Sequence, residues 1–255
     1  MEFSFTPDEE LGGATGIGYL INRISKPNYA IVAEPTGLDT VWIGSMGGIL
    51  QLDIVVRGGI PSHASQPWYG NNAFEDGIKV AYALIKELKP KIENRQFMSE
   101  RATITLGGLV KGGVSRNIVP DYFQFSIDRR ILPSEDTEDS LEELIDYING
   151  LRSNINSSVD IYVISKIESS INNGSRLLSK LMRIISNTLH VSPRVGISRV
   201  PVDTRYLQRA GIDALTYGPG SIVSAHGPDE YIEVSDIIKS VDVYSRLIME
   251  VYGDA

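Results

Sequence analysis

The chain has 255 residues and a net charge of −8 at pH 7, with 42% apolar and 22% charged residues. This length allows one large domain or two modest ones, each with its own core, and the acidic balance argues against binding to nucleic acid or acidic membranes. Because the chain has no cysteine, it forms no disulfide, and any bound metal must rest on Asp, Glu and His.

The sequence contains no recognisable membrane anchor or secretory signal. No apolar run approaches the ~20 residues needed to cross a bilayer, and no basic segment followed by an apolar run opens the chain. We therefore expect a soluble, cytoplasmic protein, in keeping with a chain free of cysteine.

The first elements suggest an open α/β sheet with carboxylates at its edge. A strand-like run over residues 2–5 precedes the acidic turn 8–10, and glycines then open a helix-like stretch. Residues 29–33 are apolar on both faces, as expected of a buried parallel strand, and they end at Glu34-Pro35-Thr36. Open α/β sheets gather their chemistry at such strand ends.

The pattern changes from about residue 46. Residues 50–56 alternate like a half-buried strand, and further strands are predicted near 102–110, 121–131 and 159–165. A first helix is predicted to bury Phe74, Ile78, Ala81, Ile85 and Leu88. A second helix presents Leu141, Leu144, Ile145, Ile148 and Leu151. The resulting β-α-β-β-α-β order is that of a split βαβ, ferredoxin-like domain.

The α/β pattern returns after about residue 167, with a helix over 175–189 and a last helix beginning near Ser235. We therefore predict an α/β fold in two parts. Residues 1–45 and 167–255 form a discontinuous catalytic domain, and residues 46–166 form an inserted ferredoxin-like α+β domain.

Three carboxylates are the first candidates for chemistry. Glu9 and Glu10 are expected to point in different directions, because successive side chains alternate on extended backbone, so that one can bind a metal while the other handles protons. The alternative is a solvated acidic turn. Glu34 ends a strand predicted to be buried, where a carboxylate without a partner is costly.

The three histidines differ in their surroundings. His226 lies in a glycine-rich loop before an acidic turn. It is a candidate metal ligand, and the alternative is a surface histidine without a specific role. His63 belongs to the inserted domain, so it could meet the other carboxylates only across an interface. His190 ends a predicted helix, where it would interact with the helix dipole.

The glycines at 13–18 superficially suggest a nucleotide-binding loop. Such a loop offers backbone N–H groups to phosphates, and the three carboxylates just upstream would repel them. We therefore do not expect nucleotide binding here.

Taken together, these segments resemble the zinc-dependent aminoacylase and carboxypeptidase family, which includes acetylornithine deacetylase, succinyl-diaminopimelate desuccinylase and bacterial glutamate carboxypeptidase. The resemblance runs in order along the whole chain. It comprises Asp8-Glu9-Glu10, Glu34-Pro35-Thr36, His63-Ala64-Ser65-Gln66-Pro67, Gly70-Asn71-Asn72-Ala73, Asn117-Ile118-Val119-Pro120, Asp128-Arg129-Arg130-Ile131-Leu132-Pro133, Asp203-Thr204-Arg205, Gly218-Pro219-Gly220, and His226 with Glu230.

The resemblance implies a zinc-exopeptidase-like catalytic domain with two zinc ions per subunit, or cobalt or manganese in their place. By position, it implies Glu9 as the general base and Glu10 as a ligand of one zinc, with Glu34 and His226 binding one at each metal. Paired metals ~3.5–4 Å apart can activate water and polarise a carbonyl, so that the base need only relay a proton.

For the inserted domain the resemblance implies a lid and dimerisation module in a homodimer. His63 would reach the partner subunit's active site and stabilise the oxyanion, while Asn117 and Arg130 would bind the substrate carboxylate. The implied function is a metal-dependent hydrolase that cleaves an N-acyl or peptide amide bond in a small carboxylate-bearing substrate.

The family takes two further metal ligands, a histidine in a His-x-Asp pattern and a bridging aspartate, from a segment before the glutamate pair. Only eight residues precede Glu9 here. We therefore expect an N-terminally truncated catalytic domain with an incomplete metal site. The competing interpretation is a noncatalytic dimeric fragment or interaction module.

Overall fold

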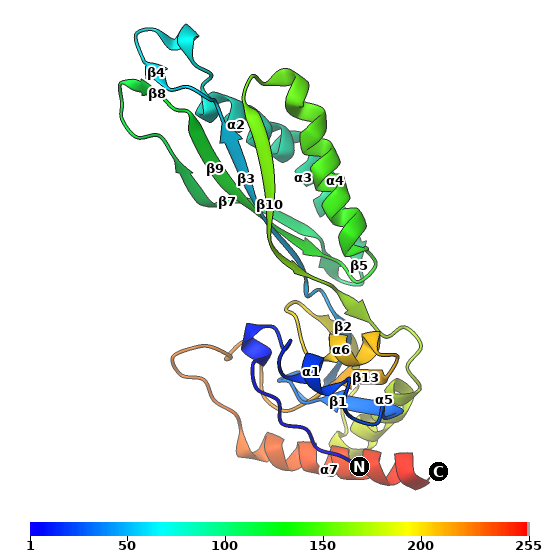
Figure 1. Ribbon diagram of the computed structural model, residues 1–255. Coiled ribbons are helices and arrows are strands. Elements are labelled where there is room, and N and C mark those ends of the chain that lie inside the picture. The colour runs from blue at the N-terminus through cyan, green and yellow to red at the C-terminus, as the bar shows by residue number, and fades with distance from the viewer. Residues whose placement is uncertain (254–255) are drawn as a thin grey trace. The chain divides into compact units, whose positions relative to one another are not determined.

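The computed structural model describes residues 1–253 and divides them into two compact units (Figure 1). Unit 1 consists of residues 1–46 and 170–253, and unit 2 consists of residues 47–169. The catalytic and lid functions expected for the two parts of the chain stay predictions. Within the described residues, no helix is long and apolar enough to cross a membrane.

Unit 1 is built on a mixed sheet in the order β1-β13-β2-β11, with β12 also paired to β2. Its strands are β1 (Tyr29–Val32), β2 (Thr40–Ser45), β11 (Ser170–Ile171), β12 (Arg194–Ser198) and β13 (Asp213–Thr216). Its helices are the 3-10 turn η1 (Glu9–Leu11), α1 (Ile17–Leu20), α5 (Arg176–Leu189), α6 (Thr204–Arg209) and α7 (Val234–Gly253). The pairs β1–β13 and β2–β12 are parallel.

One carboxylate fastens a helix of unit 1 to its sheet. Asp213, the first residue of β13, accepts hydrogen bonds from the backbone N–H groups of Arg176 and Leu177 and from the hydroxyl of Ser175, the N-cap of α5. These bonds satisfy donors that a helix start leaves unpaired. At the other end His190 is the C-cap of α5, with a left-handed φ of 55°.

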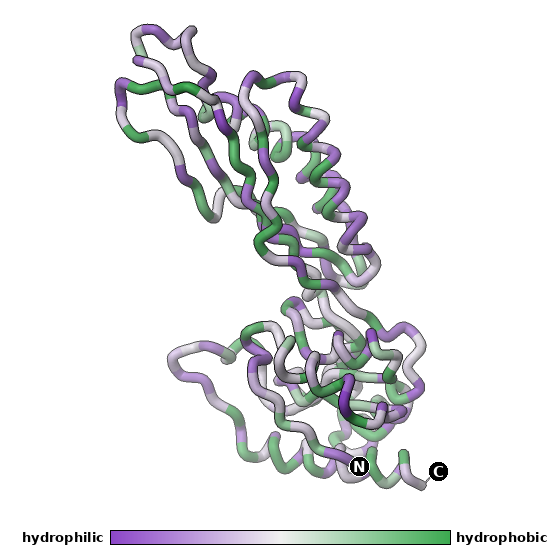
Figure 2. The backbone as a smooth tube through the Cα atoms, viewed as in Figure 1, coloured by the Kyte–Doolittle hydropathy of each residue, from purple (hydrophilic) through white to green (hydrophobic). Residues whose placement is uncertain are grey.

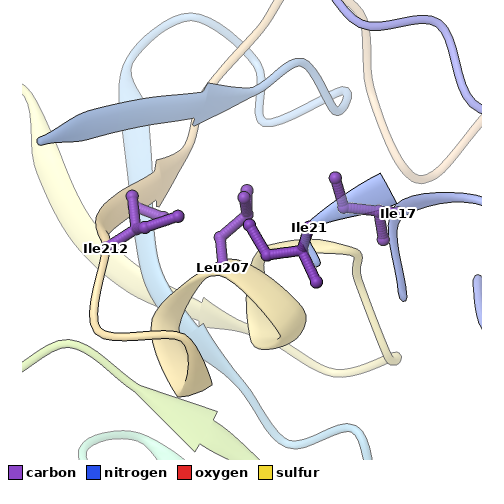
Figure 3. Packing of buried hydrophobic residues seen from close by; sticks show 5 residues of the cluster. Ile17, Ile21, Leu207 and Ile212 are labelled. Atoms are coloured by element: carbon purple, nitrogen blue, oxygen red, sulfur yellow. The ribbon is translucent and has the colours of Figure 1, made fainter. Parts of the chain in front are cut away.

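A small apolar cluster joins the N-terminal segment to α6 (Figure 3). Ile17 and Ile21 pack with Leu207 of α6 and with Ile212 and Ala214 beside and within β13, all less than 9% exposed. The chain after the acidic turn is therefore held by residues almost 200 positions later.

Two expectations for unit 1 are wrong. Residues 2–5 form no strand, because the structure pairs them with no other segment. β1 is parallel as predicted, but all four of its residues are only partly buried. Within the described residues it lies at the edge of the sheet and pairs with β13 alone, so one side of the strand remains open.

Unit 2 is an antiparallel four-stranded sheet in the order β10-β3-β9-β7. Its long strands are β3 (Gly48–Arg57), β7 (Thr103–Gly112), β9 (Tyr122–Ile131) and β10 (Ser158–Ile167). Its helices are α2 (Ala73–Ala83), continued by the π-helical turn η3 (Leu84–Leu88) and by α3 (Lys89–Glu93), and α4 (Thr137–Gly150). Short elements are β4 (Ser62–His63), η2 (Pro67–Tyr69), β5 (Gln96–Phe97), β6 (Glu100–Arg101), β8 (Ile118–Val119) and η4 (Leu151–Asn154).

The helices of unit 2 pack on one face of this sheet, and polar and apolar residues alternate along its strands (Figure 2). Helix starts are set by local capping, since Asn72 caps α2 and Asp136 caps α4. The face expected for α4 is confirmed at Leu144 and Ile148, which are fully buried.

The face expected for α2 and its continuation η3 is confirmed at Leu88, which is buried, but is wrong at Phe74, Ile78 and Ile85. Phe74, Ile78 and Ile85 are 46–49% exposed, whereas Val80 and Leu84 are buried. Both rows have helical spacing, so the apolar periodicity did not distinguish the face against the sheet from the outer face. The exposed row is therefore an apolar stripe on the surface of unit 2.

Candidate active site

The glutamate pair lies in a tight turn. Asp8, Gly12 and Gly13 have positive φ values of 69°, 101° and 66°, and the N–H groups of Leu11 and Gly13 both donate to the carbonyl of Asp8 at 2.9 Å. The expectation of extended backbone is therefore wrong, because residues 9–11 form a 3-10 turn. The two glutamates nevertheless differ in surroundings, since Glu9 is partly buried and Glu10 is exposed.

Helix α6 holds this turn from the other side. Arg205 donates to the carbonyl of Gly12 through Nη2, and the hydroxyl of Tyr206 donates to the same carbonyl at 2.8 Å. The carboxylate of Asp203 lies so close to Gly13 that a Cβ there would meet its Oδ1 at 2.2 Å. The sequence pattern gave none of these three residues a role, although Asp203-Thr204-Arg205 belonged to the resemblance.

Glu34 is positioned by the parallel strands β1 and β13. The loop after β1 is tied to the loop after β13 by the Thr36 hydroxyl, which donates to the Gly218 carbonyl at 3.3 Å and accepts from the Gly218 N–H at 3.2 Å. A Cβ on Gly218 would lie 2.7 Å from the Glu34 carbonyl, so only glycine allows this approach. Glu34 therefore stands at the carboxyl end of the parallel pair, where open sheets place their chemistry.

The carboxylates of this region repel one another. Burial and the nearby charges of Glu9, Asp203 and Glu10 raise the pKa of Glu34 to about 7. Burial, Asp203 and Glu10 also raise the pKa of Glu9, opposed by the positive charges of Arg205 and His226. The site is therefore a concentration of negative charge that a cation would stabilise.

His226 joins this cluster from the loop between β13 and α7. Its Nε2 lies 3.7 Å from Oε2 of Glu10, and its backbone N–H donates to Glu230 at 3.3 Å. Its φ of 60° is left-handed, a conformation that few side chains adopt. The structure thus brings Glu9, Glu10, Glu34 and His226 into one electrostatic cluster within unit 1.

The donor types of this cluster suit a divalent metal such as zinc, which carboxylate and imidazole groups bind. Among these donors, Glu10 and His226 form an ion pair at 3.7 Å. In the part of the chain that the structure describes, however, no three His, Asp or Glu side chains gather closely enough to hold a metal ion. The fit is therefore one of donor type and charge.

His63 and Asn117 are neighbours in unit 2. β4 and β8 pair His63 with Ile118, and the N–H of Ala64 donates to the carbonyl of Asn117 at 2.9 Å. The Nδ1 of His63 accepts the N–H of Ser65 at 3.2 Å, which leaves Nε2 as the protonated nitrogen of a neutral ring.

Arg130 lies elsewhere in unit 2. Arg130 is near the end of β9, whereas Asn117 and β8 come just before the first residue of that strand, Tyr122. At the rise of an extended strand, Tyr122 and Arg130 lie ~26 Å apart. Its guanidinium binds both carboxylate oxygens of Asp128, at 2.7 and 3.3 Å. The structure therefore does not bring Arg130 to His63 and Asn117.

Comparisons with known proteins agree along the full length of the chain. The family described as peptidase family M20/M25/M40 matches residues 1–250. A putative [LysW]-lysine/[LysW]-ornithine hydrolase of Aeropyrum pernix is 29% identical over 94% of this chain and 62% of its own length. Acetylornithine deacetylase of Myxococcus xanthus is 24% identical over 97% of this chain and 64% of its own.

Among solved structures, aminopeptidase PepT of Bacillus cereus superposes with a TM-score of 0.75 at 21% identity, over 97% of this chain and 63% of its own. This likeness shows a shared mixed α/β fold. The chain thus spans less than two thirds of the length of each of these three proteins.

Proposed function

Because this chain belongs to peptidase family M20/M25/M40, we propose that it takes part in metal-dependent hydrolysis of an N-acyl or peptide amide bond in a small carboxylate-bearing substrate. One observation carries the proposal. Burial, together with the charges of Glu9, Asp203 and Glu10, raises the pKa of Glu34 to about 7. A divalent cation would neutralise this charge, and zinc is the first candidate, with cobalt or manganese as alternatives.

We assign Glu10, Glu34 and His226 to holding the metal, and Glu9 to proton transfer. A bound divalent cation supplies Lewis-acid polarisation of the scissile carbonyl and lowers the pKa of the attacking water. Glu9 suits a general base because burial and its carboxylate neighbours Asp203 and Glu10 raise its pKa, which makes it a better proton acceptor. Glu9 would take a proton from the attacking water and pass it to the leaving amine.

In unit 2 we assign His63 to stabilising the oxyanion and Asn117 and Arg130 to the substrate carboxylate. The protonated Nε2 of His63 is a suitable donor, and Asn117 lies next to it. Arg130 can serve only by exchanging its bidentate contact with Asp128 for the substrate. In this proposal His63 acts on the active site of a second copy of the chain.

A homodimer through unit 2 gives the exposed surface of this unit a partner. The stripe of Phe74, Ile78 and Ile85 is apolar and open to solvent, and β7 is an edge strand of the described sheet. Both features favour association, because an unpaired edge and an apolar stripe each gain from a second chain. We place the dimer in the cytoplasm, in line with a cysteine-free chain.

The test is metal content combined with hydrolysis. The purified chain is analysed for bound metal and assayed on N-acetyl amino acids and short peptides, before and after zinc is added. We expect bound metal and zinc-dependent turnover that Glu9→Gln abolishes. The matched control is Glu2→Gln, which removes an exposed carboxylate from the same segment.

A second function, a noncatalytic dimeric interaction module, is favoured by one observation. Within the described residues an ion pair joins two of the proposed metal donors, Glu10 and His226, but no group of three that could hold a metal is formed. A chain that binds no metal and shows no turnover, yet is a dimer in solution, would support this function. Zinc-dependent turnover lost in Glu9→Gln would exclude it.

A further inference from the structure

A two-donor clamp on α6 holds the turn that carries Glu9 and Glu10. The carbonyl of Gly12 accepts a hydrogen bond from Arg205 Nη2 and another from the Tyr206 hydroxyl. A carbonyl oxygen has two lone pairs, so these donors use its full capacity. The donors lie more than 190 residues from Gly12 in sequence, so the clamp joins two distant segments of unit 1.

Consecutive residues of a helix normally point to different sides. Here the guanidinium of Arg205 folds over the ring of Tyr206, with 4.6 Å between its carbon and the ring centroid. This cation–π contact brings both donors to one acceptor. Arg205 is also only 5% exposed, and its two terminal nitrogens divide their contacts: Nη2 donates to the turn, whereas Nη1 donates to the carbonyl of Val202 at 3.4 Å.

The turn needs such support because its backbone is unusual. Three of its residues have positive φ, and Asp8 is not a glycine, so the conformation carries strain. The turn and the following helix α1 also fit closely against α6 and its N-cap, since a Cβ on Gly13 would strike Asp203 and a Cβ on Gly18 of α1 would lie 2.9 Å from the Tyr206 ring. Neither glycine therefore leaves room for a side chain without a shift of its neighbours.

We propose that Arg205 and Tyr206 are positioning residues, which set the direction of Glu9 and Glu10 by fixing the carbonyl of Gly12. The catalytic importance of this orientation rests on the proposed function, whereas the clamp itself does not. Neither residue needs to touch substrate or metal. Each acts through the turn.

The test compares two tyrosines of unit 1. Tyr206→Phe removes one hydroxyl from the clamp, and Tyr244→Phe removes a hydroxyl that donates to the carbonyl of Tyr217, away from the turn. Exchange of the Gly12 and Gly13 amide protons is followed by NMR in metal-free protein, since both amides bond within the turn. Co²⁺ affinity is measured by calorimetry on the same variants.

We expect Tyr206→Phe to speed exchange of both amides about tenfold and to weaken Co²⁺ binding about three- to tenfold. Tyr244→Phe should leave both unchanged. Arg205→Met should exceed Tyr206→Phe in both effects, and Arg205→Lys, which keeps a donor, should restore part of the protection. If Arg205→Met fails to fold, the tyrosine pair decides.

Equal exchange rates in Tyr206→Phe and Tyr244→Phe would overturn the clamp. Faster exchange with unchanged Co²⁺ affinity would overturn the positioning of the carboxylates, because the turn would then be ordered without consequence for the site. If the wild-type chain binds no Co²⁺, the proposed function fails, while exchange in the metal-free protein still decides the clamp.

Discussion

Replacement of Glu34 by glutamine should stabilise the metal-free protein at high pH. In the folded chain the pKa of Glu34 is raised from 4.5 to about 7, first by burial and then by Glu9, Asp203 and Glu10. The folded state therefore binds a proton more tightly than the unfolded state between these values. By linkage, the free energy of unfolding falls as the pH rises through 4.5 to 7.

The size of the effect follows from the same values. At about 1.36 kcal/mol per pKa unit, the difference between 4.5 and about 7 sets an upper limit of about 3.4 kcal/mol. Because Glu34 is only partly buried, solvent screening reduces this to about 1–2 kcal/mol. Glu34→Gln should thus match the wild type near pH 4.5 and exceed it by that amount at pH 8.

The assay is urea unfolding of chelator-treated protein at several pH values between 4.5 and 8. The chain has two tryptophans, and Trp42 is buried in β2 of unit 1, so in a Trp68→Phe background its fluorescence reports unit 1 alone. The expected gain corresponds to about 0.5–1 M urea at pH 8.

Two outcomes bear on the reasoning. A stability difference between Glu34→Gln and wild type that is the same at pH 5 and pH 8 would refute the raised pKa as its cause. With saturating zinc the wild type should become more stable than Glu34→Gln, because its carboxylate binds the cation and glutamine binds it poorly. Glu2→Gln serves as the control for loss of a carboxylate.

Three further predictions concern the turn, the inserted unit and the proposed dimer. Gly13→Ala should destabilise unit 1 by about 2–3 kcal/mol in the Trp42 fluorescence assay, because the φ of Gly13 is 66° and the new Cβ would meet a carboxylate oxygen at 2.2 Å. Gly174→Ala is the control and should change stability little, because the space around Gly174 is open. Asp76→Ala should cost about 2–3 kcal/mol at pH 7, measured by hydrogen exchange of β3 and β9, because it removes the acceptor for two N–H groups at 156–157. Burial raises the pKa of Asp76, but its hydrogen bonds lower it by more, so the net pKa is below 3.8. The destabilisation by Asp76→Ala should therefore be complete above about pH 3.8 and should disappear as the pH falls below that value. Ile78→Glu should weaken dimerisation at least about tenfold in sedimentation equilibrium, and an unchanged association constant would remove the α2 stripe from the interface.

Local patterns were sufficient for much of this fold. Alternation over 50–56 and helical spacing over 141–151 predicted the elements that the structure contains as β3 and α4, because these periodicities are properties of neighbouring residues. The ordered motifs likewise indicated the family without any knowledge of tertiary contacts, since each motif is a short run of residues. Where two apolar rows share one helix, as in α2, the local pattern could not decide which row packs on the sheet.

Tertiary structure decided what the glutamate pair meets. Nothing near residue 9 in sequence indicates that α6 supplies Arg205 and Tyr206 to the neighbouring carbonyl, or that the loop after β13 supplies His226 to Glu10. These contacts join segments about 190 or more residues apart, and they exist only because β1 and β13 pair and α6 packs beside them. Residue types and spacing therefore predicted which groups carry chemistry, whereas chain packing determined their partners, their burial and the raised pKa of Glu34.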